Sequence, residues 1–319
     1  MNYDTEKIMK QIDGTVASNN KKREKINPPF GYFGSKNNLA MRMCVDLPPH
    51  NCWVELFCGS AALTLAKEPA QIEIINDINS EITTLFSQLR NNSEELCRQV
   101  ALTPYSSEEL DISRNEDKNI DDLEKARRFL VKSMMAINGA FGKNKGGFST
   151  SNSYTRNGKE ARVNRWYNLP ERLLKVSERL RNVRIENKDA IELFNKFLNR
   201  PATLVYIDPP YLANRSSSYD EEIEEEEYHL ELLQILNKAK CMVFISGYEN
   251  QLYNSILTTK KGWVKKTIET STRGVSGDDL SRTEVIWMNK YFIANQKTGR
   301  IPLKLTEKEV KNKKVNPER

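Results

Sequence analysis

The sequence predicts an α/β fold: a mainly parallel sheet covered on both faces by helices, with a further segment inserted into it. Short apolar runs alternate with helical stretches in two zones of the chain, residues 27–90 and 183–296. Between them, residues 91–182 are helical, basic and interrupted by loops. Because alternating strands and helices are typical of parallel sheets, the middle zone is expected to be an inserted or laterally packed domain.

The first zone predicts the start of a βαβ unit. An apolar run over 52–57 ends in a turn of small residues, CGSAAL, and a helix follows as far as Lys67. A second strand over 72–78 ends in an acid. The helix expected over 79–90 begins at Asn79 or Ser80, either of which can cap it.

The third zone predicts the rest of the sheet. Residues 183–190 are expected to hold a strand and the start of a helix, and the apolar run before Asp208 another strand. A helix over 229–239 and a strand over 241–248 follow. Segments 263–270 and 283–291 predict a final antiparallel pair at the sheet edge. The polar ends, 1–26 and 297–319, are expected to be a loose arm and a charged tail.

Composition excludes several classes of protein. Of the 319 residues, 38% are hydrophobic and 29% are charged, which suffices for a soluble core. No apolar run approaches the roughly 18 residues that a membrane span needs, and the N-terminus lacks the apolar stretch of a secretory signal. The five cysteines form no CxxC pair and there are only two histidines, so no metal site is predicted. We expect a cytoplasmic protein with reduced thiols.

Positive charge is concentrated in the middle zone. The chain has a net charge of +6, but Lys125 to Arg184 contains 15 lysines and arginines against three glutamates, a local net charge of +12. Such a concentration is typical of a surface that contacts a phosphate backbone. A solvated helical face would give the same pattern.

Three strand ends carry candidate ligand-binding residues, because ligands of open α/β sheets bind beyond the carboxyl ends of the strands. Gly59 lies in the small-residue turn after the first strand, where the backbone can approach a ligand. Asp77 follows the second strand, 18 residues after Gly59, where a carboxylate can bind the hydroxyls of a ribose. An ordinary turn and a helix cap are the alternatives for these two. The third strand ends in Asp208-Pro209-Pro210-Tyr211, in which the prolines cannot continue a sheet ladder.

Together these residues resemble the Dam-type N6-adenine DNA methyltransferases, and the similarity spans about 28–292. PPFGYFGSKNNLA (28–40) is similar to the family's methionine-pocket motif, with Tyr32 and Lys36 at its aromatic and lysine positions. VELFCGSAAL (54–63) is similar to its E-x-F-x-G-x-G turn, with Phe57 and Gly59, although Ala61 replaces the second glycine.

The other motifs follow in the family's order. NDIN (76–79) supplies the ribose acid Asp77, and IENKDAIEL (185–193) resembles the motif whose acid, here Asp189, lies near the cofactor's adenine. A helix cap is the alternative for Asp189. VFISGY and RTEVIWMNKY resemble later strands, and GAFGKNKGGFST (139–150) resembles the loop that approaches DNA. The resemblance implies S-adenosylmethionine as cofactor, with Asp208 also in its site, on a seven-strand Rossmann-like sheet with an inserted target-recognition domain.

The chemistry explains the Asp-Pro-Pro-Tyr motif. The exocyclic amine of adenine is a poor nucleophile, because its lone pair is delocalised into the ring. Two acceptors against its two N–H groups, the Asp208 carboxylate and the Pro209 carbonyl, favour a pyramidal nitrogen. Pro209 and Pro210 fix φ and hold this geometry. Tyr211 stacks on the base, which must first be flipped out of the duplex.

Alternatives differ at the first residue of the motif. Cytosine C5-methylation needs a cysteine that generally follows a proline, and no cysteine here does. Cytosine N4-methyltransferases usually carry Ser at the position of Asp208, and protein-glutamine methyltransferases Asn, so Asp208 favours adenine. RNA adenine, and a nucleic-acid-binding module with a decayed site, stay open as alternatives.

The expected partner is double-stranded DNA, and the protein is expected to be a monomer. The sequence leaves open whether a cognate restriction endonuclease accompanies it, and it does not reveal a recognition site. The acidic run DEEIEEEE (220–227) is expected to be a solvated first helical turn that suits the helix dipole. The alternative is that this run repels DNA from the wrong face.

Overall fold

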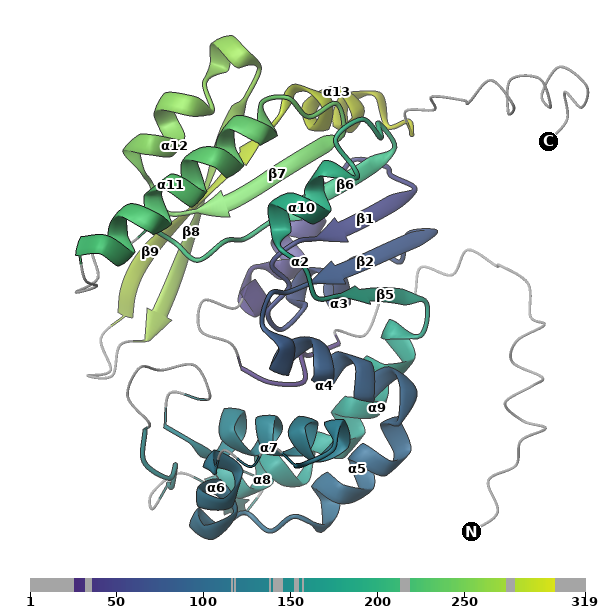
Figure 1. Cartoon of the computed structure of the whole chain (residues 1–319), viewed down its shortest axis with the longest axis vertical. Coiled ribbons are helices and arrows are strands. Elements are labelled where there is room, and N and C mark those ends of the chain that lie inside the picture. Colours follow the sequence, from purple (N-terminus) through teal and green to yellow (C-terminus); the bar gives the residue numbers. More distant parts are fainter. Residues whose placement is uncertain are drawn as a thin grey trace, which may run out of the picture.

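The fold is described from a computed structural model, which covers residues 26–31, 36–115, 117, 119–137, 139, 146–151, 155–156, 158–212, 219–273 and 279–301 (Figure 1). Most of the expected N-terminal arm and C-terminal tail lies outside these residues, as does the predicted site residue Tyr32. Within the described residues, no helix is long and apolar enough to cross a membrane, and no group of three His, Cys, Asp or Glu side chains is placed to hold a metal ion.

Seven strands form one sheet in the order β5–β2–β1–β6–β7–β9–β8. The first five are parallel, and β9 pairs antiparallel with both β7 and β8. This confirms the predicted α/β class, the seven-strand Rossmann-like sheet and its antiparallel final pair. The strands are β1 Cys52–Glu55, β2 Ile72–Asn76, β5 Val183–Glu186, β6 Thr203–Ile207, β7 Met242–Gly247, β8 Val264–Arg273 and β9 Asp279–Met288.

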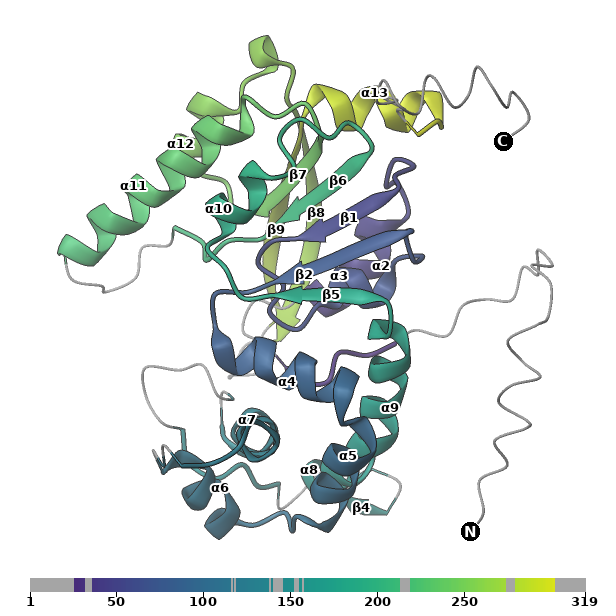
Figure 2. The same cartoon turned by 45° about the vertical axis from the view of Figure 1, so that its right-hand side comes forward.

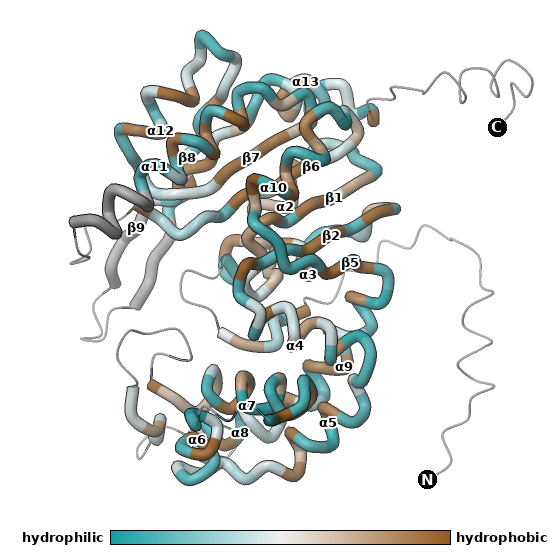
Figure 3. The backbone as a smooth tube through the Cα atoms, viewed as in Figure 1, coloured by the Kyte–Doolittle hydropathy of each residue, from teal (hydrophilic) through white to brown (hydrophobic). Residues whose placement is uncertain are grey.

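The central strands are apolar because both faces of the sheet are covered. Every residue of β1, β6 and β7 is buried, and hydrophobic residues run along β7 in Figure 3. Alternate residues point to opposite faces, so Val54 and Val205 join one buried cluster while Trp53 and Leu204 join another. This double burial is why these strands are continuous apolar runs in the sequence.

Helices from different parts of the chain cover the two faces (Figures 1 and 2). The cluster with Val54 includes residues of α10 (Ala190–Asn195), α11 (Tyr219–Leu236) and α12 (Gln251–Ile256). The cluster with Trp53 includes residues of α2 (Ala40–Cys44), α3 (Ala62–Ala66) and α13 (Lys290–Thr298). Two 3₁₀ turns complete this part, η1 Lys36–Asn38 and η2 Thr259–Lys261.

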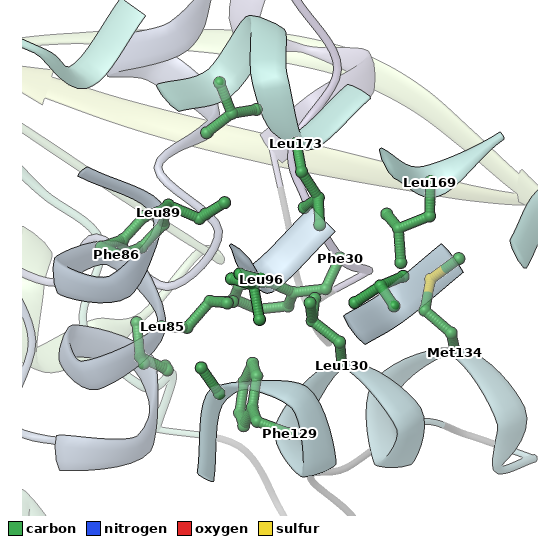
Figure 4. Packing of buried hydrophobic residues seen from close by; sticks show 14 of the residues in the cluster. Phe30, Leu85, Phe86, Leu89, Leu96, Phe129, Leu130, Met134, Leu169 and Leu173 are labelled. Carbon is green, nitrogen blue, oxygen red and sulfur yellow. The ribbon is translucent and has the colours of Figure 1, made fainter. Parts of the chain in front are cut away.

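The basic zone forms a helical part beyond the β5 edge of the sheet (Figures 1 and 2). It contains a third buried cluster, shown in Figure 4, in which the Phe30 ring meets the Phe129 ring edge-on at 4.9 Å. Its elements are α5 Ser93–Leu102, α6 Ser107–Arg114, α7 Asp122–Met135, α8 Ala161–Tyr167, α9 Leu169–Leu180 and the hairpin strands β3 Thr155–Arg156 and β4 Lys159–Glu160. Helix α4, Ser80–Asn91, precedes them and packs in the same cluster.

Helix α4 joins the sheet to this helical part. Asn79 is its N-cap, accepting a hydrogen bond from the Glu81 amide at 2.9 Å. Leu85 and Phe86 pack in the same cluster as residues of α7 and α9, and α4 lies between the sheet and α7 in both views. The division of the chain at residues 90 and 182 therefore stays a prediction, because the packing of α4 crosses the first of these boundaries.

The loop that was predicted to approach DNA is closed at its base, although its residues 140–145 lie outside the described part. The Ile137 amide donates to Gly147 O at 2.8 Å, and the Ser149 amide to Met135 O at 2.7 Å. Residue 146 must be glycine here, because a Cβ at this position would collide with the Ile137 carbonyl.

The last strand ends earlier than expected, at Met288, and is followed by helix α13, which the sequence pattern did not predict. Asn289 lies between the end of β9 and the start of α13. Its Oδ1 accepts from the Phe292 amide at 2.9 Å, which caps α13, and from the Val243 amide at 3.1 Å, which binds the cap to β7. The cap and the glycine at 299 were readable signals, but the aromatic residues Trp287, Tyr291 and Phe292 favoured a longer strand.

Candidate active site

The candidate site lies where the carboxyl ends of β6 and β7 meet. Asp208 directly follows β6, and Ser246 is near the end of β7, which pairs with β6 in parallel. The Ser246 hydroxyl donates to Asp208 Oδ1 at 2.8 Å, and the Tyr206 hydroxyl is hydrogen-bonded to the same serine at 2.8 Å. Adjacent strands thus fix the first residue of the Asp-Pro-Pro-Tyr motif.

Four side chains form a group that we call the Lys36 cluster: Lys36, Asp208, Tyr211 and Glu284. Lys36 and Glu284 are buried, and Asp208 and Tyr211 are partly buried. Lys36 Nζ lies 3.1 Å from Asp208 Oδ1 and 3.4 Å from Glu284 Oε1, and it also contacts the Tyr211 hydroxyl. That hydroxyl lies 2.9 Å from Asp208 Oδ1 and within hydrogen-bond distance of Glu284 Oε1. The structure therefore brings two predicted catalytic residues, Asp208 and Tyr211, together with the predicted cofactor residue Lys36.

Burial and charge act in opposite directions on this cluster. Burial lowers the pKa of Lys36, but the charges of Asp208 and Glu284 outweigh this effect and hold it above its ordinary value. Burial raises the pKa of Glu284, and Lys36 offsets only part of the increase. Burial also raises the pKa of Tyr211, so its hydroxyl stays protonated and remains a hydrogen-bond donor.

The two prolines and the tyrosine differ in exposure. Pro209 is buried and Pro210 is exposed, while Tyr211 is partly buried. The Tyr211 ring lies edge-on against Tyr248, with centroids 4.6 Å apart, and Lys36 Nζ is 4.7 Å from its centroid. Tyr248 follows β7 and is 36% exposed, so an accessible aromatic side chain stands beside the motif.

A second group lies at the carboxyl ends of β1 and β2. Asp77 is 7% exposed and accepts from the Gly59 amide at 2.9 Å and from the Asn79 amide at 3.0 Å, with one carboxylate oxygen each. Gly59 and Ala61 both have left-handed backbones, with φ of 46° and 55°. Burial raises the pKa of Asp77, although the two amides lower it. The predicted residues Gly59 and Asp77 are thus in direct contact.

The structure also describes two further predicted cofactor residues, Asp189 and Phe57. Asp189 caps α10 by accepting from the Glu192 amide at 2.9 Å, as the alternative for this residue proposed, and lies 3.4 Å from the Tyr228 hydroxyl. Asn187 connects its loop to β2, because its side-chain amide donates to Asp77 O at 2.7 Å. Phe57 is partly buried and packs against the cluster that contains Val54. Its role and that of Asp189 in cofactor binding stay predictions.

Sequence reasoning missed Glu55 and Glu284. Glu55 ends β1, is 2% exposed, and accepts from the Thr64 amide at 3.0 Å and from the Thr64 hydroxyl, so it holds the start of α3. Burial raises its pKa to about 7. A signal existed for both, since each is an acid directly beside an apolar run.

The cations of the basic zone differ in whether they form an ion pair with a carboxylate. Most cations outside residues 156–172 form ion pairs with carboxylates: Lys125, Arg127, Arg128, Lys132, Lys175, Arg179 and Arg184. Lys143 and Lys145 lie outside the described residues. Another group, on and around α8, has no ion pair with a carboxylate among the residues described, and we call it the α8 surface: Arg156, Lys159, Arg162, Arg165 and Arg172.

Comparison with known proteins finds a family whose pattern matches this chain and a relative of similar sequence. The pattern of the D12 class N6 adenine-specific DNA methyltransferases matches residues 32–271. A relative, the Type II methyltransferase M1.LlaDCHI of Lactococcus lactis subsp. cremoris, is 26% identical over 305 residues, which cover 84% of this chain and 97% of the relative.

Two solved structures are similar at a lower level. The putative methyltransferase yhhF from Escherichia coli is 11% identical, with a TM-score of 0.32 over 86% of this chain and 90% of its own. The precorrin 8W decarboxylase of Methanobacterium thermoautotrophicum is 10% identical, with a TM-score of 0.31 over 79% of this chain and 87% of its own. We draw nothing from either likeness.

Proposed function

The chain belongs to the D12 class of N6 adenine-specific DNA methyltransferases, and from this premise we propose how its site carries out the reaction. The family and the Type II relative establish DNA adenine methylation as its activity. The roles of individual residues, the methyl donor and the DNA-contacting surface are our proposals, and each is argued below from the contacts of the residues concerned.

The observation that carries the mechanism is the unequal use of the two Asp208 oxygens. Oδ1 is contacted by Lys36 Nζ, the Tyr211 hydroxyl and the Ser246 hydroxyl. Oδ2 accepts no hydrogen bond from the residues described, and the side chain is 18% exposed. A carboxylate fixed through one oxygen, with the other open, is preorganised to accept a hydrogen bond from a substrate.

We assign that open oxygen to the target adenine. Asp208 Oδ2 would accept one N–H of the exocyclic amine and the Pro209 carbonyl the other, which exposes the nitrogen lone pair for attack. Pro209 and Pro210 limit backbone motion between the two acceptors. The flipped base would stack on Tyr211, and Tyr248, edge-on beside it, would extend the aromatic surface.

The methyl donor proposed for this class is S-adenosylmethionine, which supplies an electrophilic methyl group on a sulfonium. The Asp77 carboxylate fits a sugar with two hydroxyls, because each oxygen has one amide donor and keeps a lone pair for a further one. The left-handed backbone at Gly59 brings its amide to that carboxylate. Tyr32, Lys36, Phe57 and Asp189 are proposed to complete the site.

The mechanism is tested by transfer of labelled methyl groups to unmethylated plasmid DNA. We expect Asp208→Ala to lower the rate of transfer at saturating donor by about a hundred- to a thousandfold, as for loss of a preorganised hydrogen-bonding group, with circular dichroism retained. Asp46→Ala, at an exposed position, serves as the control. A rate for Asp208→Ala close to that of the wild type would refute the assignment, and label on RNA but not on DNA would change the substrate.

We propose that duplex DNA contacts the α8 surface. Its cations lack carboxylate partners among the described residues, and four of the five are exposed. Phosphates would neutralise them, so removing one phosphate-binding cation should lower the slope of log affinity against log salt by about 1. We expect Arg162→Ala with Arg165→Ala to lower this slope for a short duplex by about 2. Arg98→Ala, which removes an exposed cation paired with Glu95, should leave the slope unchanged, and equal slopes in all variants would exclude this surface.

We also propose that methylation is site-specific and belongs to a restriction–modification context, because the relative is a Type II methyltransferase. Sequencing that detects methylated adenine in DNA from expressing cells should reveal one short recurrent motif. Methylation spread over unrelated adenines would contradict this proposal.

A further inference from the structure

Glu284 is the member of the Lys36 cluster that the proposed mechanism does not use. It is 5% exposed and is followed along β9 by four buried apolar residues, Val285 to Met288. Antiparallel pairing of β9 with β7 sets Val285 against Gly247 and Ile286 against Ser246. Glu284, the preceding residue of β9, therefore reaches the carboxyl end of β7, where Asp208 and Tyr211 also lie.

The charges in this cluster do not balance. One ammonium, on Lys36, faces two carboxylates, on Asp208 and Glu284. Among the described residues no second cation forms an ion pair with either carboxylate. An ion pair that served stability alone would need only one carboxylate, because surplus buried charge is costly.

A surplus negative charge becomes favourable when a cation binds beside it. The reacting partners must meet at Asp208, because this residue holds the amine in the proposed mechanism. The methyl donor is cationic at its sulfonium, whereas the demethylated product is a neutral thioether. Buried charges are screened weakly by salt, so the cluster can distinguish these two molecules by charge although their shapes are nearly the same.

We propose that Glu284 is a specificity-determining residue that makes the site bind the cationic methyl donor in preference to its neutral product. This proposal rests on the proposed function of the site. The alternative is that Glu284 only holds the Tyr211 hydroxyl and Lys36 in place. In that case its removal would weaken the binding of donor and product by the same factor.

The test measures the dissociation constants of S-adenosylmethionine and S-adenosylhomocysteine by calorimetry on the full chain. Glu284→Gln keeps the size and one acceptor but removes the charge. We expect the donor to bind about tenfold more weakly and the product to change less than about twofold, as for loss of one nearby buried charge. Glu284→Asp, which keeps the charge, should retain most of the preference.

A matched control lies on the neighbouring strand. Glu269 of β8 is exposed and is paired in register with Thr283, the residue before Glu284. Glu269→Gln should leave both constants unchanged. Equal weakening of donor and product in Glu284→Gln, or no change in either, overturns the proposal.

A further measurement uses only the wild-type protein. An analogue in which a protonated amine replaces the sulfonium should bind more tightly than the thioether product, because the cluster responds to charge and not to sulfur. If donor, analogue and product bind equally, Glu284 has no such role. Methyl transfer by the same preparation shows separately whether the proposed function holds, so the two failures can be told apart.

Discussion

Two buried charge clusters in this protein have opposite imbalances. The first, which we call the Glu73 cluster, consists of Lys67, Glu73 and Arg179 and has two cations for one carboxylate. The Lys36 cluster has two carboxylates for one ammonium. Each side chain of the Glu73 cluster is at most 5% exposed, whereas Asp208 in the Lys36 cluster is 18% exposed. The two clusters also differ in the groups that bind their surplus charge.

In the Glu73 cluster both cations also donate to backbone carbonyls, although Arg179 Nε has no hydrogen-bond partner among the described residues. Arg179 forms two hydrogen bonds with the Glu73 carboxylate and donates a further one to Thr64 O at 2.7 Å, and Lys67 donates to Glu68 O. These contacts join α9 of the helical part to β2 and α3. In the Lys36 cluster, by contrast, Asp208 keeps one oxygen open. The comparison indicates that the Glu73 cluster, whose charged groups bind one another and backbone carbonyls, holds elements of the fold together. The Asp208 oxygen that accepts no hydrogen bond from the described residues is available for chemistry.

The largest effect should follow from breaking the Glu73 cluster. Glu73→Gln leaves two buried cations without a carboxylate and should lower the free energy of unfolding by about 3–5 kcal/mol. Urea denaturation at pH 7 measures this change. Glu171→Gln, which alters an exposed pair with Lys175, should cost less than about 1 kcal/mol. A loss for Glu73→Gln as small as this control would show that the cluster contributes little to stability.

A pH series should separate the contributions of individual buried groups to the free energy of unfolding, because each group titrates over a different pH range. Burial lowers the pKa of His229 to about 4 from an ordinary value of 6.5, and its Nδ1 is hydrogen-bonded to the Tyr253 hydroxyl at 2.8 Å. The unfolded chain therefore binds a proton between pH 6.5 and 4 that the folded chain does not. Stability is fully present above pH 6.5 and should fall by roughly 3 kcal/mol as the pH decreases to 4.

The control for this pH series is His229→Gln, which should remove that part of the slope. The comparison with the variant is needed because Glu55, with its pKa raised to about 7, contributes a slope of opposite sign. Glu73 behaves differently again. Burial raises its pKa, but hydrogen bonds from Arg179 and the charges of Lys67 and Arg179 outweigh this and lower it below 4.5. Its contribution is lost only in more acidic solution. Parallel curves for wild type and His229→Gln would contradict the assignment.

The smallest effect should follow from neutralising Glu284. Glu284→Gln removes repulsion between two carboxylates, while Asp208 still pairs with Lys36. The free energy of unfolding should stay within about 1 kcal/mol of the wild type, or increase, as is common at functional sites. Urea denaturation beside Glu73→Gln measures the contrast. A loss as large as that of Glu73→Gln would mean that the two clusters serve the same structural purpose.

Much of the fold could be predicted because its signals are local. The apolar runs at 52–57 and 241–248 are buried on both faces of the sheet and are visible without any knowledge of neighbours. Helix α13 was missed although its cap, Asn289, is a local signal, because neighbouring aromatic residues favoured a longer strand. The bond from the Val243 amide to Asn289, 46 residues away in the chain, is visible only in the structure. Ser246 was missed because it lies 38 residues from Asp208 and reaches it only through the pairing of β6 with β7.

By itself the sequence determined the class of fold, the succession of its strands along the chain and the Asp-Pro-Pro-Tyr motif, since each depends on residues that are adjacent or regularly spaced. Only the tertiary structure decided which charges meet. Lys36 and Tyr211 are 175 residues apart, and Tyr211 and Glu284 are 73 apart. Their contact depends on sheet order and on the antiparallel direction of β9, as does the distinction between paired cations and the α8 surface. Ion pairing is a property of distance in space, and the identity of a charged residue does not reveal what lies beside it.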